Sequence, residues 1–223
     1  GPDDAGAWVD AQAGIALGHR RLSIVDLSPA GHQPMHSAAE RFVLAFNGEI
    51  YNHLDLRAEL EAAGAAPAWR GHSDTETLLA AFEQWGLEAT LKRTVGMFAI
   101  ALWDRRERTL HLARDRFGEK PLYYGWVNGA FVFGSELKAL RAYPGFANPV
   151  SREALALYMR FTYVPAPHSI YQGIYKLEPG CLLSVCGQPP KMADFQPLRP
   201  PANGQGITLR RWWSLADVVE AGA

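Results

Sequence analysis

Residues Phe46-Asn47-Gly48-Glu49-Ile50-Tyr51-Asn52 directly follow Arg41–Ala45, an apolar stretch rich in residues that favour a β-strand. We expect this strand to end at Asn47 and Gly48, where the chain presents hydrogen-bond donors instead. Asn47 carries a side-chain amide, and Gly48 lets a backbone N–H approach a ligand closely because glycine has no Cβ. Two donors aimed at one point form an oxyanion hole, in which losing one donor typically lowers the rate about 10²–10³-fold. The alternative is a hairpin turn, for which Asn-Gly is a strong signal.

A second polar position follows the short apolar strand predicted at Gly14–Gly18, in the sequence GHRRLSIVD at residues 18–26. An arginine next to an apolar strand is ordinarily a charge at the surface. Arg21 also suits a binding role, because its planar guanidinium can hold a carboxylate through two parallel hydrogen bonds, which lysine cannot do.

A third polar position is at the predicted start of a helix. Ser73 and Glu76 form an S-x-x-E capping box before a periodic apolar run, and this structural role explains both residues. Asp74 between them is favoured by the helix dipole, by about 0.3–1 kcal/mol. Its carboxylate can face a pocket at the same time.

These stretches together resemble the glutaminase domain of glutamine-hydrolysing asparagine synthetases, which are class II glutamine amidotransferases. The similarity covers GPDDAG at 1–6, GHRRLSIVD at 18–26, FNGEIYN at 46–52, SDTE at 73–76 and RDRFGEKPLYY at 114–124. Pattern alone predicts only an α/β or α+β fold. The resemblance implies a four-layer αββα sandwich of the N-terminal-nucleophile hydrolase type, truncated at its N-terminus.

The resemblance also assigns roles to the polar positions. It implies that Arg21 holds the α-carboxylate of L-glutamine, that Asp74 and Glu49 hold its α-amino group, and that the backbone of 22–25 walls the pocket. Asn47 and Gly48 then form the oxyanion hole for attack on the side-chain amide. The predicted substrate-binding residues are Arg21, Leu22, Ser23, Ile24, Val25, Asn47, Gly48, Glu49 and Asp74.

The nucleophile of the resembled family is a cysteine at the start of the mature protein, upstream of the GPDDAG motif. This chain begins inside that motif, so we expect a truncated domain that is inactive by itself. Its two cysteines, Cys181 and Cys186, are predicted on opposite faces of one strand, as reduced structural thiols without a disulfide.

The domain organisation implied by the resemblance has three parts. Residues 1–186 are the amidotransferase domain, 187–208 are a loop or linker rich in Pro and Gly, and 209–223 lead toward a synthetase domain. ATP and magnesium are expected in that absent domain and no cofactor in this chain. The whole protein would be a carbon–nitrogen ligase of asparagine biosynthesis that uses glutamine as amido donor.

Two other functions stay open. One is a glutamine-binding or regulatory module without catalysis, and the other is an amidotransferase whose acceptor is not aspartate. The purine and glucosamine enzymes of the superfamily have other sequences at the positions that correspond to residues 18–26 and 46–52 of this chain.

Composition restricts the partners further. Lys and Arg number 22 against 23 Asp and Glu, so no basic stripe suggests nucleic acid, and no apolar run is long enough for a membrane span. A cytoplasmic location is the default expectation, and a homodimer is left open. His32 and His36 share a loop, but no third ligand at suitable spacing supports a metal site.

Overall fold

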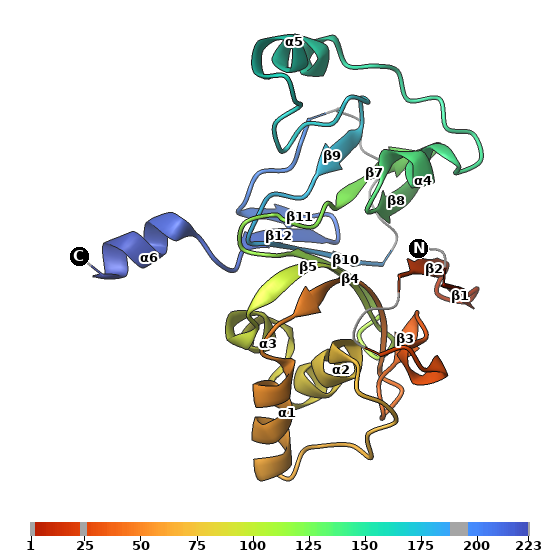
Figure 1. Ribbon diagram of the computed structural model, residues 1–223. Helices are drawn as coiled ribbons and strands as arrows, with labels where there is room; N and C mark the ends of the chain where they lie inside the picture. Colours follow the sequence, from red (N-terminus) through yellow and green to blue (C-terminus); the bar gives the residue numbers. More distant parts are fainter. Residues whose placement is uncertain (1–2, 23–25, 188–195, 223) are drawn as a thin grey trace. The chain divides into compact units, whose positions relative to one another are not determined.

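The computed structural model describes residues 3–22, 26–187 and 196–222. The chain divides into two compact units, residues 1–112 and 113–223. The elements are labelled in Figure 1. None of the helices in the described ranges is long and apolar enough to cross a membrane.

The first unit opens with a two-stranded hairpin. Strand β1 (Asp4–Asp10) pairs antiparallel with β2 (Ile15–Arg21), and Asp4 lies opposite Arg21. The short strand expected at Gly14–Gly18 is therefore present and extends further than expected. This extension makes Arg21 the last residue of β2.

The stretch at 46–52 belongs to a strand that continues through Asn47 and Gly48. Strand β4 (Phe42–Ile50) pairs antiparallel with β5 (Gly96–Asp104), and Gly48 lies opposite Phe98. On the other edge, β3 (Met35–His36) pairs with only Val43 and Leu44, and β6 (Thr109–Arg114) follows β5 in the strand order. The expectation that the strand ends at Asn47 was wrong, as was the alternative of a turn.

Three helices complete the first unit: α1 (His53–Ala62), α2 (Asp74–Trp85) and α3 (Leu87–Arg93), with a 3₁₀ turn at Pro29–Gly31. Helices α1 and α2 lie on one side of β4 and β5 (Figure 1). Phe42 of β4 packs edge-on against Phe82 of α2, at 6.4 Å between ring centroids. Because side chains alternate along a strand, Phe42, Phe46 and Ile50 share one face of β4. Asn47 and Glu49 therefore point to the opposite face.

The second unit contains two groups of strands. Strand β7 (Tyr123–Val127) pairs with β8 (Ala130–Gly134) and β9 (Ile174–Lys176). Asn128 and Gly129 between β7 and β8 have positive φ angles of 48° and 78°, as expected of a type I′ turn, which favours an Asn-Gly dipeptide. Helices α4 (Leu137–Arg141) and α5 (Arg152–Phe161) follow β8 in the chain. The core here is formed by Val127, Val132, Leu140 and Ile174.

The second group of strands includes residues whose composition predicts a linker. Strand β10 (Cys181–Cys186) pairs with β12 (Ile207–Arg211), which pairs with β11 (Ala202–Gly204). The range 187–208 was expected to lack regular structure, but β11 and the start of β12 lie within it. The Pro- and Gly-rich composition of 187–208 does not predict these strands, of which β12 also pairs with β10, about twenty residues earlier in the chain.

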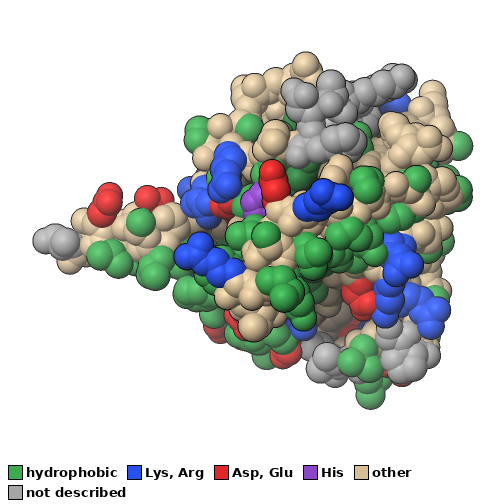
Figure 2. All heavy atoms as spheres, turned by 90° about the horizontal axis from the view of Figure 1, so that it is seen from above, with side chains coloured by type: hydrophobic (Ala, Val, Ile, Leu, Met, Phe, Trp, Pro, Cys, Tyr) green, Lys and Arg blue, Asp and Glu red, His purple; other side chains and the backbone are tan. Residues whose placement is uncertain are grey.

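The last helix, α6 (Leu215–Gly222), buries none of its residues. Leu215, Val218 and Val219 are spaced along one face, and all three are exposed. Figure 2 shows hydrophobic side chains along one flank of this helix and acidic ones on another. The described part of the chain shows no element that covers this face.

Candidate functional site

The edge of β4 away from β5 carries the polar groups of the candidate site. Backbone N–H groups alternate between the two edges of a strand. The N–H of Phe46 donates to Gln33 Oε1 at 2.7 Å, and the N–H of Ile50 donates to Asp74 Oδ2 at 2.9 Å. Gly48 lies midway between these two residues. Its N–H therefore points to the same edge, about 7 Å along the strand from that of Ile50.

Gly48 also has a packing reason to be glycine. A Cβ at this position would lie 2.2 Å from the carbonyl oxygen of Met97 and 2.8 Å from Phe98 Cα, both in the backbone of β5. The close pairing of β4 and β5 thus explains the residue type without a ligand. Close packing and ligand binding are compatible explanations for Gly48. Its N–H points away from β5, whereas a Cβ would meet the backbone of β5.

Asp74 is the first residue of α2, and its carboxylate is buried, with the residue 5% exposed. Burial raises the pKa of the Asp74 carboxyl above its ordinary value. The negative charge of Glu49 adds to the rise in pKa, whereas the N–H of Ile50 and the imidazole of His53 oppose it. Within the described ranges Asp74 forms no ion pair. A buried carboxylate that forms no ion pair is suited to receive a ligand's ammonium group.

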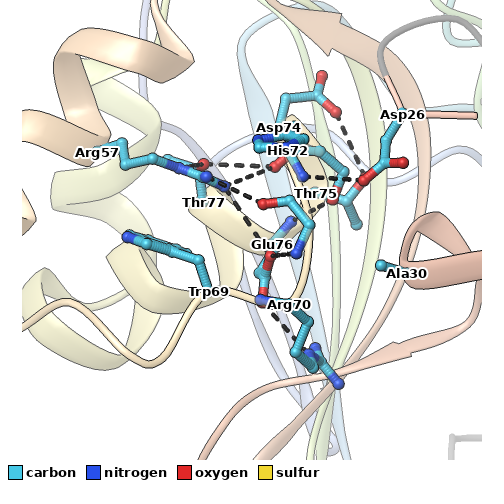
Figure 3. A network of polar contacts seen from close by, with 12 residues as sticks. Asp26, Ala30, Arg57, Trp69, Arg70, His72, Asp74, Thr75, Glu76 and Thr77 are labelled. Carbon is cyan, nitrogen blue, oxygen red and sulfur yellow. Dashed lines mark hydrogen bonds and ion pairs between the residues drawn. The ribbon is translucent and has the colours of Figure 1, made fainter. Parts of the chain in front are cut away.

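The start of α2 is fixed by a network of polar contacts (Figure 3). Ser73 Oγ accepts the N–H of Glu76 at 3.2 Å, which confirms one half of the predicted capping box. The other half differs, because the Glu76 carboxylate accepts the N–H groups of Arg70 at 2.9 Å and Gly71 at 3.1 Å. Arg57 and Arg70 form ion pairs with the same carboxylate. Glu76 thus organises the segment that leads into Asp74.

His53 is a residue of this neighbourhood that the sequence analysis missed. It begins α1, three residues after Ile50, and its imidazole acts on the charge of Asp74. Its Nδ1 is buried and has no hydrogen-bond partner in the described part of the chain. The available signal was a polar residue at a helix start directly after the strand that carries Asn47 and Glu49.

Arg21 is 8% exposed, so it is not the ordinary surface charge considered as the alternative. Its guanidinium donates to the carbonyl oxygens of Asp26 and, at 3.4 Å, of Ser28. A Cβ at Gly31 would lie 2.0 Å from Arg21 Nη2, so glycine makes room for the guanidinium. These two bonds use two of the five guanidinium donors, and the others leave capacity for a carboxylate.

The structure brings some of the predicted site residues near one another. Asp74 accepts the N–H of Ile50, which follows Gly48 and Glu49 on β4. Arg21 is connected to this strand only indirectly, through Asp26 and the segment before Asp74. Leu22 is described and 60% exposed. Ser23, Ile24 and Val25 lie outside the described residues. The binding roles of all these residues stay predictions.

The buried cysteine does not have the properties of a nucleophile. Cys181 is buried, and burial raises the pKa of its thiol to about 11, so the reactive thiolate is scarce at neutral pH. Cys186 is exposed at the end of β10, and both belong to the second unit. Their different exposure agrees with opposite faces of one strand, and both are free thiols.

The histidines of the 28–36 loop have protein partners. His32 Nδ1 lies 2.7 Å from Asp4 Oδ2, and His36 packs edge-on against Trp8, at 5.9 Å between ring centroids. In the described ranges, no group of three or more His, Cys, Asp or Glu is placed to hold a metal ion.

Comparisons with known proteins place this chain in a family. A family model described as glutamine amidotransferase domain matches residues 1–195. "Asparagine synthetase [glutamine-hydrolyzing] 1" of Bacillus subtilis is 41% identical over 185 residues, which cover 83% of this chain and 28% of that protein. "Amidase chry2" of Gibberella zeae is 33% identical over 191 residues, which cover 83% of this chain and 26% of that protein. The chain belongs to the glutamine amidotransferase domain family.

Solved structures support the fold. Glutamine phosphoribosylpyrophosphate amidotransferase from B. subtilis matches with a TM-score of 0.57 at 20% identity, covering 89% of this chain and 35% of that chain. This similarity confirms the predicted α/β fold class. The chain spans less than a third of the length of the two curated relatives named above.

Proposed function

We propose that this chain binds L-glutamine and is the glutaminase domain of an asparagine-synthetase-like amidotransferase. The observation that carries the proposal is the buried carboxylate of Asp74, which forms no ion pair in the described ranges and lies on the edge of β4 that also carries the Gly48 N–H. An ammonium group at Asp74 would be partnered by a full negative charge, with Glu49 adding to the local field.

The spacing along β4 supports glutamine as the ligand. The Gly48 N–H lies about 7 Å along the strand from the N–H that holds Asp74. This separation is comparable to that between the α-amino group and the side-chain carbonyl of an extended glutamine. With its ammonium at Asp74, glutamine would bring its side-chain amide to Gly48 and Asn47. There the two donors would stabilise the oxyanion of a tetrahedral intermediate.

Hydrolysis additionally needs a nucleophile, and the proposal assigns it to a cysteine outside residues 1–223. Its thiolate would attack the amide carbon of glutamine, ammonia would leave, and water would release glutamate from the resulting thioester. The high pKa of Cys181 supports this assignment, because a thiol that stays protonated is a poor nucleophile.

The experiment is glutamate release from glutamine by this chain and by a version extended upstream to the terminal cysteine expected from the family. We expect release only from the extended protein, and loss of that release when the added cysteine is replaced by serine. Release by the unextended chain would contradict the mechanism and point to Cys181 or Cys186. Silence in both proteins, with glutamine still bound, would favour the non-catalytic module.

For the acceptor of the ammonia, the proposal is aspartate, activated with ATP and magnesium in a synthetase domain. It is supported by the 41% identity to a protein named asparagine synthetase. An acceptor other than aspartate is the second candidate, because the relatives of this chain are not all named asparagine synthetases. Asparagine formation by the complete natural protein, supplied with glutamine, aspartate and ATP, distinguishes the two.

A further inference from the structure

The loop after β2 and the segment before α2 are joined at one buried side chain, that of Asp26. The residue is 6% exposed. Its Oδ1 accepts the N–H of Ser28 at 2.8 Å, and its Oδ2 accepts the N–H of His72 at 2.9 Å. Figure 3 shows the connection from Asp26 to His72, which is two residues before Asp74. One carboxylate thus joins two segments that are 46 residues apart in the sequence.

The same loop holds the guanidinium of Arg21. The main-chain carbonyl of Asp26 accepts a hydrogen bond from Arg21 Nη2, and the carbonyl of Ser28 accepts one from Nη1. When the Asp26 side chain fixes the loop through the Ser28 N–H, it also fixes the carbonyl groups that orient Arg21. The position of Arg21 therefore depends on the Asp26 carboxylate.

The two segments leave little room to slide past each other. A Cβ at Gly71 would lie 2.4 Å from Asp26 Oδ2 and 2.8 Å from the Cβ of Ala30. Hydrogen bonds from the Ser28 side chain and then from the His72 and Ser28 backbone lower the pKa of Asp26 to about 2. The carboxylate is therefore ionised over the whole neutral range, as a strong acceptor of both N–H groups requires.

We propose that Asp26 is a positioning residue, which sets the spacing between Arg21 and Asp74 so that both charged ends of one α-amino acid are bound together. The inference rests on the proposed function, in which these two residues hold the carboxylate and the ammonium. A ligand with two linked charges gains from binding the second charge only when both partners are at the correct separation. A carboxylate that only stabilised the loop would not make glutamine binding depend on this separation.

The test compares three ligands on the chain and on Asp26→Asn. Asparagine keeps one acceptor oxygen but turns an N–H donor toward the second backbone N–H, so one of the two connections breaks. The ligands are glutamine, glutaramic acid, which lacks the α-amino group, and γ-aminobutyramide, which lacks the α-carboxylate. Dissociation constants come from NMR titration. Because the spacing matters only to a ligand with both charges, glutamine should bind about tenfold or more weakly to the variant, and each one-ended ligand within about threefold of its original affinity.

The matched control is Asp104→Asn in the same unit. Asp104 is also a buried carboxylate that accepts backbone N–H groups, from Arg106 at 2.9 Å and Glu107 at 3.1 Å. Its replacement should lower the melting temperature and leave the glutamine affinity unchanged. If Asp26→Asn fails to fold, Gly71→Ala is the second variant, because it keeps the carboxylate and pushes the two segments apart. It should weaken the binding of glutamine more than the binding of either one-ended ligand.

The outcomes separate this inference from the proposed function. Failure of the unaltered chain to bind glutamine contradicts the proposed function and the inference with it. Glutamine binding that is unchanged in Asp26→Asn, or weakened by the same factor as both one-ended ligands, overturns the inference alone. The same selective loss in Asp104→Asn also overturns it, because the effect would then follow from general destabilisation.

Discussion

Asp74 carries a negative charge that the unliganded protein accommodates at a cost in stability. Its carboxylate is buried, burial raises its pKa, and in the described ranges it forms no ion pair. Buried charges in proteins are ordinarily paired, and those that are not commonly serve a ligand. The loss of stability caused by this buried charge is therefore expected if Asp74 binds the ammonium group of a ligand.

Replacing Asp74 by asparagine separates binding from stability. The amide oxygen can still accept the N–H of Ile50, but it offers no charge to an ammonium group. Loss of one partner of a buried, hydrogen-bonded charge pair costs about 2 kcal/mol or more, which is at least about 30-fold in the glutamine dissociation constant. Thermal unfolding of the unliganded variant should occur at the same temperature or higher, since the desolvated charge is gone.

The control for Asp74→Asn is Asp55→Asn in α1, because Asp55 is exposed and also lies in the first turn of a helix. Calorimetric titration with glutamine should give an unchanged dissociation constant for this control. Equal affinities for Asp74→Asn and the original chain would rule out Asp74 as the ammonium partner.

The raised pKa of Asp74 gives glutamine binding a characteristic pH dependence. Binding requires the ionised carboxylate, so affinity should fall as pH drops through a pKa that is above the ordinary aspartate value. The stability of the unliganded protein should change in the opposite direction. A carboxyl whose pKa is raised by folding destabilises the fold above that pKa, and the loss is relieved as pH falls from the raised pKa toward the ordinary one.

Titration calorimetry over the acid to neutral range, with urea unfolding at the same pH values, measures both trends. In Asp74→Asn, the part of each trend that comes from this carboxyl should disappear. An affinity for glutamine that stays constant until the ordinary aspartate pKa is reached would contradict the assignment.

At the scale of the element, Gly48 connects strand pairing with the site. Gly48→Ala places a Cβ against the backbone of β5 and should destabilise the chain by about 1–3 kcal/mol, the usual cost of overpacking. Gly18→Ala in β2 is the matched control, because a Cβ there meets nothing closer than the Gly6 carbonyl oxygen at 4.0 Å. Urea unfolding measures both variants, and equal free energies of unfolding would contradict the close packing of β4 on β5.

The Asn-Gly dipeptide occurs at 47–48 and at 128–129, and the two places show which elements the sequence could predict. Asn128-Gly129 forms a turn between β7 and β8, whereas Asn47-Gly48 continues a strand paired with Ala99 and Phe98. The local turn preference is the same in both places. Pairing with β5, some fifty residues later in the chain, decides the second case, and no local signal announces it. The strands within 187–208 were missed because their residues lack the apolar alternation of a strand, although β11 and β12 pair locally.

At the scale of the whole molecule, the strands after residue 200 determine where the chain can be shortened without a loss of stability in the second unit. Ile207, Leu209 and Trp212 are buried, each with about 1.5–3 kcal/mol of transfer free energy if fully removed from water. A chain that ends at residue 187 should therefore melt well below the full chain and aggregate through the exposed edge of β10. A chain that ends at residue 214 loses only α6, which buries nothing, and should keep its melting temperature.

Differential scanning calorimetry on the two shortened chains distinguishes the boundaries. If the chain ending at 187 is as stable as the full chain, residues 187–208 act as the linker that composition suggests. The predicted boundary at residue 186 would then be preferred over one that includes β11 and β12.

The site was predictable where its signals were local or carried by motifs, and not where it depends on contacts between distant segments. The S-x-x-E pattern located Asp74, and the strand at 41–45 located Asn47 and Glu49. Asp26 stood in a quoted motif, but its role depends on the N–H of His72, which only the fold brings near. His53 was missed because its electrostatic effect on Asp74 likewise links the starts of two separate helices.

The most direct measurement is a crystal structure of the chain with glutamine bound. The account predicts the α-amino nitrogen within hydrogen-bond distance of the Asp74 carboxylate, the α-carboxylate at Arg21 and the side-chain carbonyl oxygen at the Gly48 N–H. Glutamine bound elsewhere, or with its amide end at Asp74, would contradict the proposed site.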